Sequence, residues 1–116
     1  MKVELRVKTK QEFQQVIKGS KVANSSFVLY YTNNEFSNSR FGISASKKLG
    51  NAVIRSTTRR RVRGLVQKLI KEKEIIKMDY VIIVRKPFLE KEFLENYNEL
   101  EKLFQLVWRK ESEKIN

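Results

Sequence analysis

The residues of this chain that could do chemistry are mostly basic, and they gather between Arg40 and Lys71. No Asp or Glu occurs between Glu35 and Glu72, and ten of the 25 basic residues lie in that gap. The stretch therefore carries +10 of a net charge of +12. Such a concentration favours a polyanionic partner, either nucleic acid or an anionic membrane surface.

Residue types that the chain lacks exclude several kinds of chemistry. It has no His and no Cys, so a Ser-His-Asp or Cys-His nucleophile, a disulfide and the usual zinc sites cannot be built. Asp79 is the one aspartate, which argues against a self-contained protein nuclease. The absence of cysteine fits a reducing compartment, and the start, MKVELRVKTKQEF, contains no apolar signal segment. We therefore expect a cytoplasmic protein with no membrane span.

A long helix from about Asn51 to Glu72 should carry most of the arginines. Its apolar stripe has helical spacing, with members 4, 4, 3 and 4 residues apart: Ile54, Thr58, Val62, Leu65 and Leu69, widened by Val66. Arg59, Arg60 and Arg63 fall in another sector, and Arg55 borders the apolar seam. Gly64 lies on the exposed side, where it costs about 1 kcal/mol relative to alanine.

The sheet that supports this helix should contain three clear strands. Ser26–Thr32 and Arg40–Ser46 are joined by a short polar loop, so we expect them to pair in antiparallel fashion. Asp79–Arg85 is nearly continuously apolar, which is typical of a strand buried on both faces. The element order also allows a further short strand near Val22. The small residues on one side of Arg40–Ser46 would leave that face of the sheet shallow.

Two more helices should flank the sheet. Thr9 and Glu12 can form a capping box, Phe13, Val16 and Ile17 then share one face, and Gly19 ends the helix as a C-terminal glycine. The last helix, about Leu89–Lys110, has an apolar stripe that we expect to be core: Phe93, Tyr97, Leu100, Phe104 and Val107, broadened by Leu103 and Trp108. With 41% hydrophobic residues in 116, residues 1–116 should form a single α+β domain with helices packed on one sheet.

The identity of the polyanion can be narrowed from the arginine helix. A charge run is usually a solvated face, but here no acidic partner stands at i+4, so like charges repel without compensation. Arg outnumbers Lys five to none between Arg55 and Arg63, and the guanidinium fork suits phosphate oxygens. Lys47, Lys48 and Gly50 precede the helix start, where free backbone N–H groups also favour anions.

Structured RNA fits better than DNA or a membrane. The Arg55–Arg63 stretch offers Ser and Thr rather than the Asn or Gln that read DNA bases, which favours backbone contact and shape. Phe13, Tyr30 and Tyr31 could offer rings to unpaired bases. The helix buries its apolar side in a core and has no aromatic face for lipid. The residues alone therefore predict an RNA-binding protein without identifying the RNA.

The block SKKLGNAVIR at 46–55, followed by Arg59, Arg60 and Arg63, resembles the central motif of the bacterial ribonuclease P protein subunit. The helix around Phe13 and the three strands also follow that family's order and spacing. The resemblance implies a small α/β sandwich, with helices packed on a mixed four-stranded sheet as in a ribosomal-protein domain. It also implies a left-handed strand–helix–strand crossover around the basic helix.

The resemblance further implies a role beside a catalytic RNA that removes the 5′ leader from precursor tRNA with bound Mg²⁺. The partners would be the catalytic RNA and the precursor tRNA, with no other protein required. Residues carried over as contacts to the catalytic RNA are Lys47, Lys48, Asn51, Arg55, Arg59, Arg60 and Arg63. Those carried over as the lining of a leader-binding cleft are Phe13, Ile17, Val28 and Tyr30.

The chain departs from the family pattern at several positions. Ser56 and Thr57 stand where an Asn and an Arg usually follow Arg55, and Arg61 should point elsewhere on the helix. Ile17 occupies the place of a frequent second aromatic, so it would pack on a base without a π-face. A ribosomal-type RNA-binding module with the same fold remains an alternative. Restoration of leader cleavage by the catalytic RNA at low Mg²⁺ would distinguish the two functions.

Overall fold

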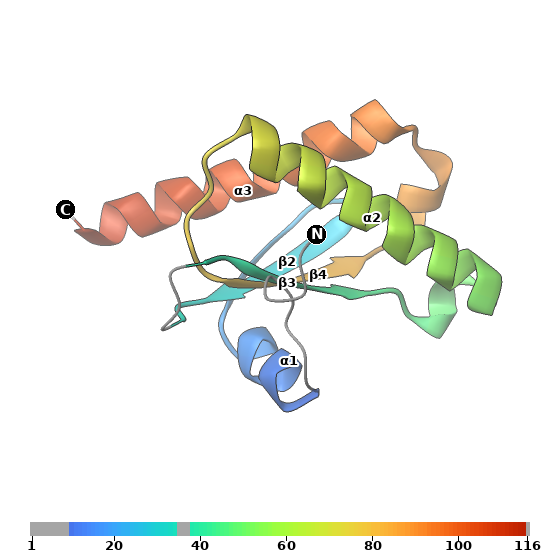
Figure 1. Ribbon diagram of the computed structural model, residues 1–116, viewed down its shortest axis with the longest axis horizontal. Helices are drawn as coiled ribbons and strands as arrows, with labels where there is room; N and C mark the ends of the chain where they lie inside the picture. Colours follow the sequence, from blue (N-terminus) through green and yellow to red (C-terminus); the bar gives the residue numbers. More distant parts are fainter. Residues whose placement is uncertain (1–9, 35–37, 116) are drawn as a thin grey trace.

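The computed structural model describes residues 10–34 and 38–115, and its elements form an α+β fold with three α-helices on a mixed four-stranded sheet (Figure 1). In chain order they are α1 (Lys10–Ile17), β1 (Ser20–Ala23), β2 (Phe27–Thr32), β3 (Arg40–Ser44), η2 (Lys47–Leu49), α2 (Ala52–Glu72), β4 (Asp79–Val84), η3 (Lys86–Glu90) and α3 (Phe93–Ile115). Helices α2 and α3 cover one face of the sheet, and α1 lies against the other. The predicted helices-on-sheet arrangement is confirmed, including the short strand around Val22.

The strand order is β1-β2-β4-β3, with β4 antiparallel to β2 and parallel to β3. The expected antiparallel pair of β2 and β3 is therefore wrong, because β4 lies between them. The reason is the composition of β4: Tyr80, Val81 and Ile82 are all fully buried. A strand this apolar is most stable where it has a neighbour on each edge and cover on each face, which is the centre of the sheet. The parallel pair β3–β4 is joined through α2 and forms a strand–helix–strand crossover unit, whose left-handedness stays a prediction.

Helix α2 begins where the sequence predicts it. The Asn51 side chain caps it by accepting a hydrogen bond from the Ile54 backbone N–H at 3.0 Å. The predicted stripe is buried from Thr58 onward, and the Thr58 hydroxyl donates to the carbonyl of Ile54 at 2.7 Å. Ile54 itself is 39% exposed, contrary to expectation. It lies in the first turn of α2, which extends past the strands (Figure 1), so the sheet does not cover it.

Helix α3 begins at Phe93 and runs to Ile115, so the predicted bounds Leu89–Lys110 are wrong at both ends. Pro87 instead lies in the first turn of the separate 3₁₀ helix η3, which begins at Lys86. The middle of the predicted stripe is core, with Leu100, Leu103 and Val107 at most 1% exposed. Two expected core residues are not buried: Phe93 is 47% and Trp108 is 49% exposed. Helical spacing identifies a face but does not say how far along the helix that face has a partner.

The opposite face of the sheet carries the short helix α1. Val16 is buried beneath it, while Phe13 and Ile17 are half-buried. Gly19 follows the helix as expected, but its φ is not in the left-handed region. Glycine is needed there for space, since a Cβ would lie 2.6 Å from the carbonyl oxygen of Tyr31. Thr9 lies outside the described residues, so the capping box stays a prediction.

Candidate nucleic-acid interface

The basic side chains predicted to contact RNA lie on η2 and α2, and we call them together the basic surface: Lys47, Lys48, Arg55, Arg59, Arg60 and Arg63. Lys47, Lys48 and Arg60 are exposed, and the other three are half-buried. Within the described part of the chain, none of these six side chains forms an ion pair. The carboxylates of α3 do not approach them. Their charges are therefore available to an external anion.

The turn before α2 holds the two lysines against the helix start. Gly50 has φ +146°, which side-chain-bearing residues rarely adopt, and a Cβ there would lie 2.8 Å from Cδ1 of Ile54. The Gly50 backbone N–H donates to the carbonyl of Lys47 at 3.2 Å. Because the Oδ1 atom of Asn51 is used in capping α2, the amide nitrogen of Asn51 is the part that can donate to an RNA acceptor.

The arginines of α2 differ in what surrounds them. The Nε atom of Arg55 is buried and has no hydrogen-bond partner in the described residues, a costly arrangement for a charged donor. Arg61 lies over the ring of Phe88, with its Cζ atom 5.9 Å from the ring centroid. This cation–π contact directs Arg61 toward η3, as its helical position predicts, and keeps it off the basic surface.

The four residues predicted to line a leader cleft share the other face of the sheet. Val28 and Tyr30 alternate with the buried core residues of β2, and both are half-buried. Phe13 and Ile17 come from α1, which contacts both β2 and β4. The Nζ atom of Lys21 lies 5.8 Å from the centroid of the Tyr30 ring, which adds a cation to this side of the sheet. We call this surface the open sheet face.

The open sheet face and the basic surface lie on opposite sides of the sheet, and they meet at the carboxyl ends of β3 and β4. A hollow of about 480 Å³ lies there, lined by Ser46, Lys48, Leu49, Ile83, Val84, Arg85, Lys86 and Pro87. Ile83 pairs with Val28 in the sheet register and shares its face. The sequence reasoning missed Arg85 and Lys86 as site candidates. The sequence does indicate them, because two cations directly follow an apolar strand. Parallel strands place their carboxyl ends, and the residues that follow, at one edge of the sheet.

A buried ion-pair cluster fixes α1 to the sheet. The Arg40 guanidinium donates to Asp79 from Nε at 2.8 Å and from Nη2 at 2.6 Å, and to Glu12 from Nη1 at 2.6 Å. Asn34 also donates to Asp79, at 2.7 Å. The hydrogen bond with Asp79 raises the pKa of Arg40 above its ordinary value despite partial burial, so the guanidinium stays charged. This cluster places Glu12 of α1 over the sheet edge.

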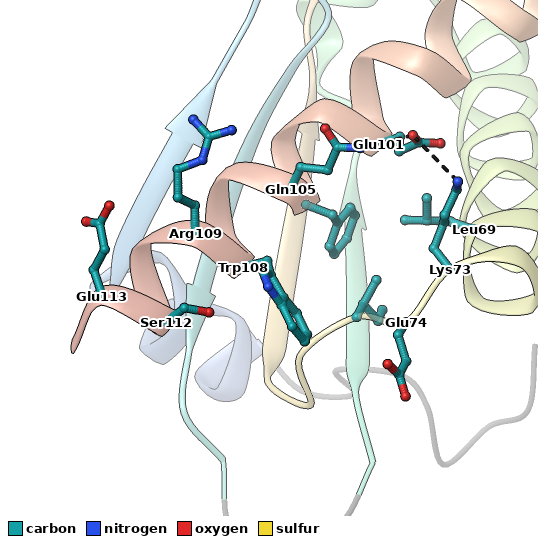
Figure 2. A pocket seen from close by; sticks show the side chains of 11 residues that line it. Leu69, Lys73, Glu74, Glu101, Gln105, Trp108, Arg109, Ser112 and Glu113 are labelled. Carbon is teal, nitrogen blue, oxygen red and sulfur yellow. Dashed lines mark hydrogen bonds and ion pairs between the residues drawn. The ribbon is translucent and has the colours of Figure 1, made fainter. Parts of the chain in front are cut away.

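A second hollow, of about 520 Å³, lies between α3 and the end of α2 (Figure 2). Trp108 and Phe104 contribute apolar walls, and Glu101 pairs with Lys73 at 4.0 Å. Glu74 and Glu113 also line it. This mixture of charges does not suit a phosphate backbone, so the hollow is not part of the candidate interface.

No helix in the described residues is long and apolar enough to cross a bilayer.

Comparison with known proteins agrees with this geometry. A family model described as Ribonuclease P matches residues 1–107. The chain is 40% identical over 104 residues to the ribonuclease P protein component of Mesoplasma florum, covering 89% of this chain and 94% of the relative. It is 40% identical over 119 aligned positions to that of Bacillus velezensis, covering 98% and 100%. The solved Staphylococcus aureus RNase P protein superposes with a TM-score of 0.78 at 37% identity, covering 89% of this chain and 94% of that one.

Proposed function

Because this chain belongs to the bacterial ribonuclease P protein family, whose members are components of a ribonucleoprotein endoribonuclease of tRNA processing, we propose that it binds two RNA segments at the same time. The catalytic RNA would bind the basic surface, and the 5′ leader of precursor tRNA would bind the open sheet face. The observation that carries the proposal is the basic surface itself, whose arginines lack any ion pair in the described residues.

The basic surface suits a folded RNA. Arg55, Arg59 and Arg63 follow one another at i, i+4 and i+8, so they form a line of donors along one side of α2. Planar guanidinium groups bind phosphate oxygens in pairs, and they act without reading base sequence. The buried Nε of Arg55 would gain an acceptor when a phosphate approaches, which offsets the cost of its burial.

The open sheet face suits a single strand. Tyr30 and Phe13 can stack on unpaired bases, and such stacking tolerates any base sequence because every base has a π-face. Ile17 and Val28 add apolar contact without a ring. The hollow beside Lys48, Arg85 and Lys86 leads from this face toward the basic surface. A strand on the open sheet face would therefore enter the catalytic RNA where the two surfaces meet.

Magnesium would be held by the RNA rather than by this chain. Among the described residues, no three acidic side chains gather closely enough to hold a cation. The basic surface would also repel a divalent ion. The described residues therefore offer no acidic cluster that fits a magnesium ion, and we assign no step to a protein-bound metal. The role of this chain would be to neutralise phosphates where two RNAs crowd together.

The test of the basic surface is the salt dependence of binding. Arg59→Ala combined with Arg60→Ala should weaken binding to the cognate ribonuclease P RNA and flatten the slope of log Kd against log[salt] by about 1.4 to 1.8, since each lost phosphate contact contributes about 0.7 to 0.9. Lys102→Ala combined with Lys110→Ala is the matched control, because it removes the same charge from exposed positions on α3. Equal slopes for both double variants would remove α2 from the interface.

The open sheet face is tested by substrate discrimination. Tyr30→Ala should leave affinity for the catalytic RNA unchanged and weaken binding of precursor tRNA at least about fivefold more than binding of mature tRNA, because one stacked base is worth about 1–3 kcal/mol. Phe93→Ala is the control, since it removes an aromatic ring that is 47% exposed on α3. Equal losses for both tRNAs would show that Tyr30 does not contact the leader.

A further inference from the structure

The first turn of α2 exposes an apolar tip that the protein itself does not use. Val53 is 73% exposed and Ile54 is 39% exposed, and Ala52 beside them is exposed as well. Valine is a poor choice for a solvated helix turn, since its branched side chain loses rotamer freedom there. Packing within the chain does not explain this residue. We call Ala52, Val53 and Ile54 the apolar tip.

The surroundings of the apolar tip are cationic. Lys47 and Lys48 precede it and are exposed, and Arg55 follows it directly. No acidic residue occurs from 36 to 71, so the neighbourhood repels basic partners and attracts polyanions. The tip is also held firmly, because the Asn51 cap bonds to the Ile54 N–H and the Gly50 turn packs against the Ile54 side chain. A rigid apolar tip surrounded by cationic side chains fits a partner that offers both phosphates and an apolar surface.

We propose that Val53, supported by Ile54, packs against the face of an unpaired base of the catalytic RNA and adds a salt-independent contact to the basic surface. Paired RNA cannot provide this contact, because its major groove is too narrow for side chains and its bases are stacked. A base at a bulge, a loop or a helix end presents its face. The inference rests on the proposed binding of catalytic RNA by α2, and it specifies which part of that RNA meets the helix start.

The test uses the whole chain and the cognate ribonuclease P RNA over a range of salt concentrations. Val53→Ser should raise Kd about fivefold to tenfold at every salt concentration, as expected when a largely exposed valine becomes covered on binding, with the slope unchanged. Val53→Ile should bind as tightly as the unaltered chain. Both variants should fold normally, because the side chain is 73% exposed. In 2′-hydroxyl acylation mapping, Val53→Ser should increase reactivity at one or a few unpaired nucleotides.

The outcomes separate this inference from the proposed function. If Val53→Ser binds like the unaltered chain while Arg59→Ala with Arg60→Ala flattens the salt slope, the inference fails and the proposed function stands. If the arginine variant has no effect on the slope, the proposed function fails first. Reactivity changes confined to base-paired nucleotides would overturn the base contact, and so would a Val53-dependent affinity for phosphatidylglycerol vesicles with unchanged RNA binding.

Discussion

The cluster of Arg40, Glu12 and Asp79 offers a graded perturbation of the open sheet face. The side chain of Asp79 is 8% exposed and that of Arg40 is 11% exposed, whereas the side chain of Glu12 is 32% exposed. Arg40 makes two hydrogen bonds to Asp79 and one to Glu12. Neutralising each carboxylate in turn should therefore have different consequences for stability and for leader binding.

The expected magnitudes follow from burial. Asp79→Asn removes the more buried of the two described carboxylates that bind the Arg40 guanidinium, and removing one member of a buried ion pair costs about 3–5 kcal/mol. Because Arg40 keeps Glu12, we expect the lower end, about 3 kcal/mol off the free energy of unfolding. Glu12→Gln removes a partly solvated charge, so we expect a loss of at most about 1 kcal/mol. Urea unfolding followed by circular dichroism measures both.

Glu12→Gln should also weaken leader binding. Asp79→Asn cannot measure this effect separately, because it destabilises the whole fold more strongly. With the ion pair to Arg40 weakened, α1 is held less firmly, and Phe13 and Ile17 lose their fixed position beside Tyr30. We expect the preference for precursor over mature tRNA to fall about twofold to fivefold, since a loss of at most about 1 kcal/mol limits the change. Glu95→Gln, which makes the same charge change at an exposed position of α3, controls for the gain in net positive charge.

The reasoning would be refuted by either of two results. Equal destabilisation by Asp79→Asn and Glu12→Gln would mean that burial does not set the strength of this cluster. A full precursor preference in Glu12→Gln, together with the expected small loss of stability, would mean that α1 does not need Arg40 to shape the open sheet face. Both measurements must be made at one salt concentration, because RNA binding depends steeply on salt.

Two further predictions concern α2 and its contact with α3. Gly64→Ala should raise the free energy of unfolding by about 0.5–1 kcal/mol, because a Cβ there meets no atom within 4 Å and alanine favours the helix; an unchanged urea midpoint would contradict this. Burial, together with the hydrogen bond that its hydroxyl donates to Glu72, raises the pKa of Tyr97 to about 12 from the ordinary value of 10.0. The folded chain therefore binds the phenolic proton of Tyr97 more tightly than the unfolded chain does. The resulting contribution to the free energy of unfolding is complete below about pH 10 and is lost as pH rises through about 12. Tyr97→Phe should remove that alkaline loss and the corresponding step in phenolate absorbance, and a titration of Tyr97 near pH 10 would disprove the contact.

Features encoded locally in the sequence were predictable. The cap Asn51 and the spacing of Val62, Leu65 and Leu69 identify α2 and its buried side, because helix start and helix face are set by residues a few positions apart. The alternation of β2 identifies Val28 and Tyr30 as sharing one face. The spacing of the apolar stripe also placed the arginines on α2, with Lys47 and Lys48 before the helix start, where the structure has them.

Features that depend on contacts far apart in the sequence were not predictable in the same way. The predicted pairing of β2 with β3 was wrong. The two strands are adjacent along the chain, which favours that pairing, but the burial of β4 favours a position between them. The Arg40 cluster joins residues 28 and 39 positions apart, and no periodicity reports such a contact. The exposure of Ile54 and Trp108 depends on where α2 and α3 extend beyond their partners. Helical spacing contains no information about that limit.

The open sheet face exists because the two faces of the sheet are covered unequally. Helices α2 and α3 enclose Leu29, Tyr80 and Ile82 completely, so one face supplies the core. Helix α1 has eight residues, of which Val16 alone is buried. A longer α1 would cover Tyr30 and gain apolar area, but it would leave no surface for a single strand. A helix this short has too little apolar contact to fix its own position, and we therefore expect a buried ion pair to do so. The sensitivity of leader binding to Glu12 follows from this shortage of apolar contact.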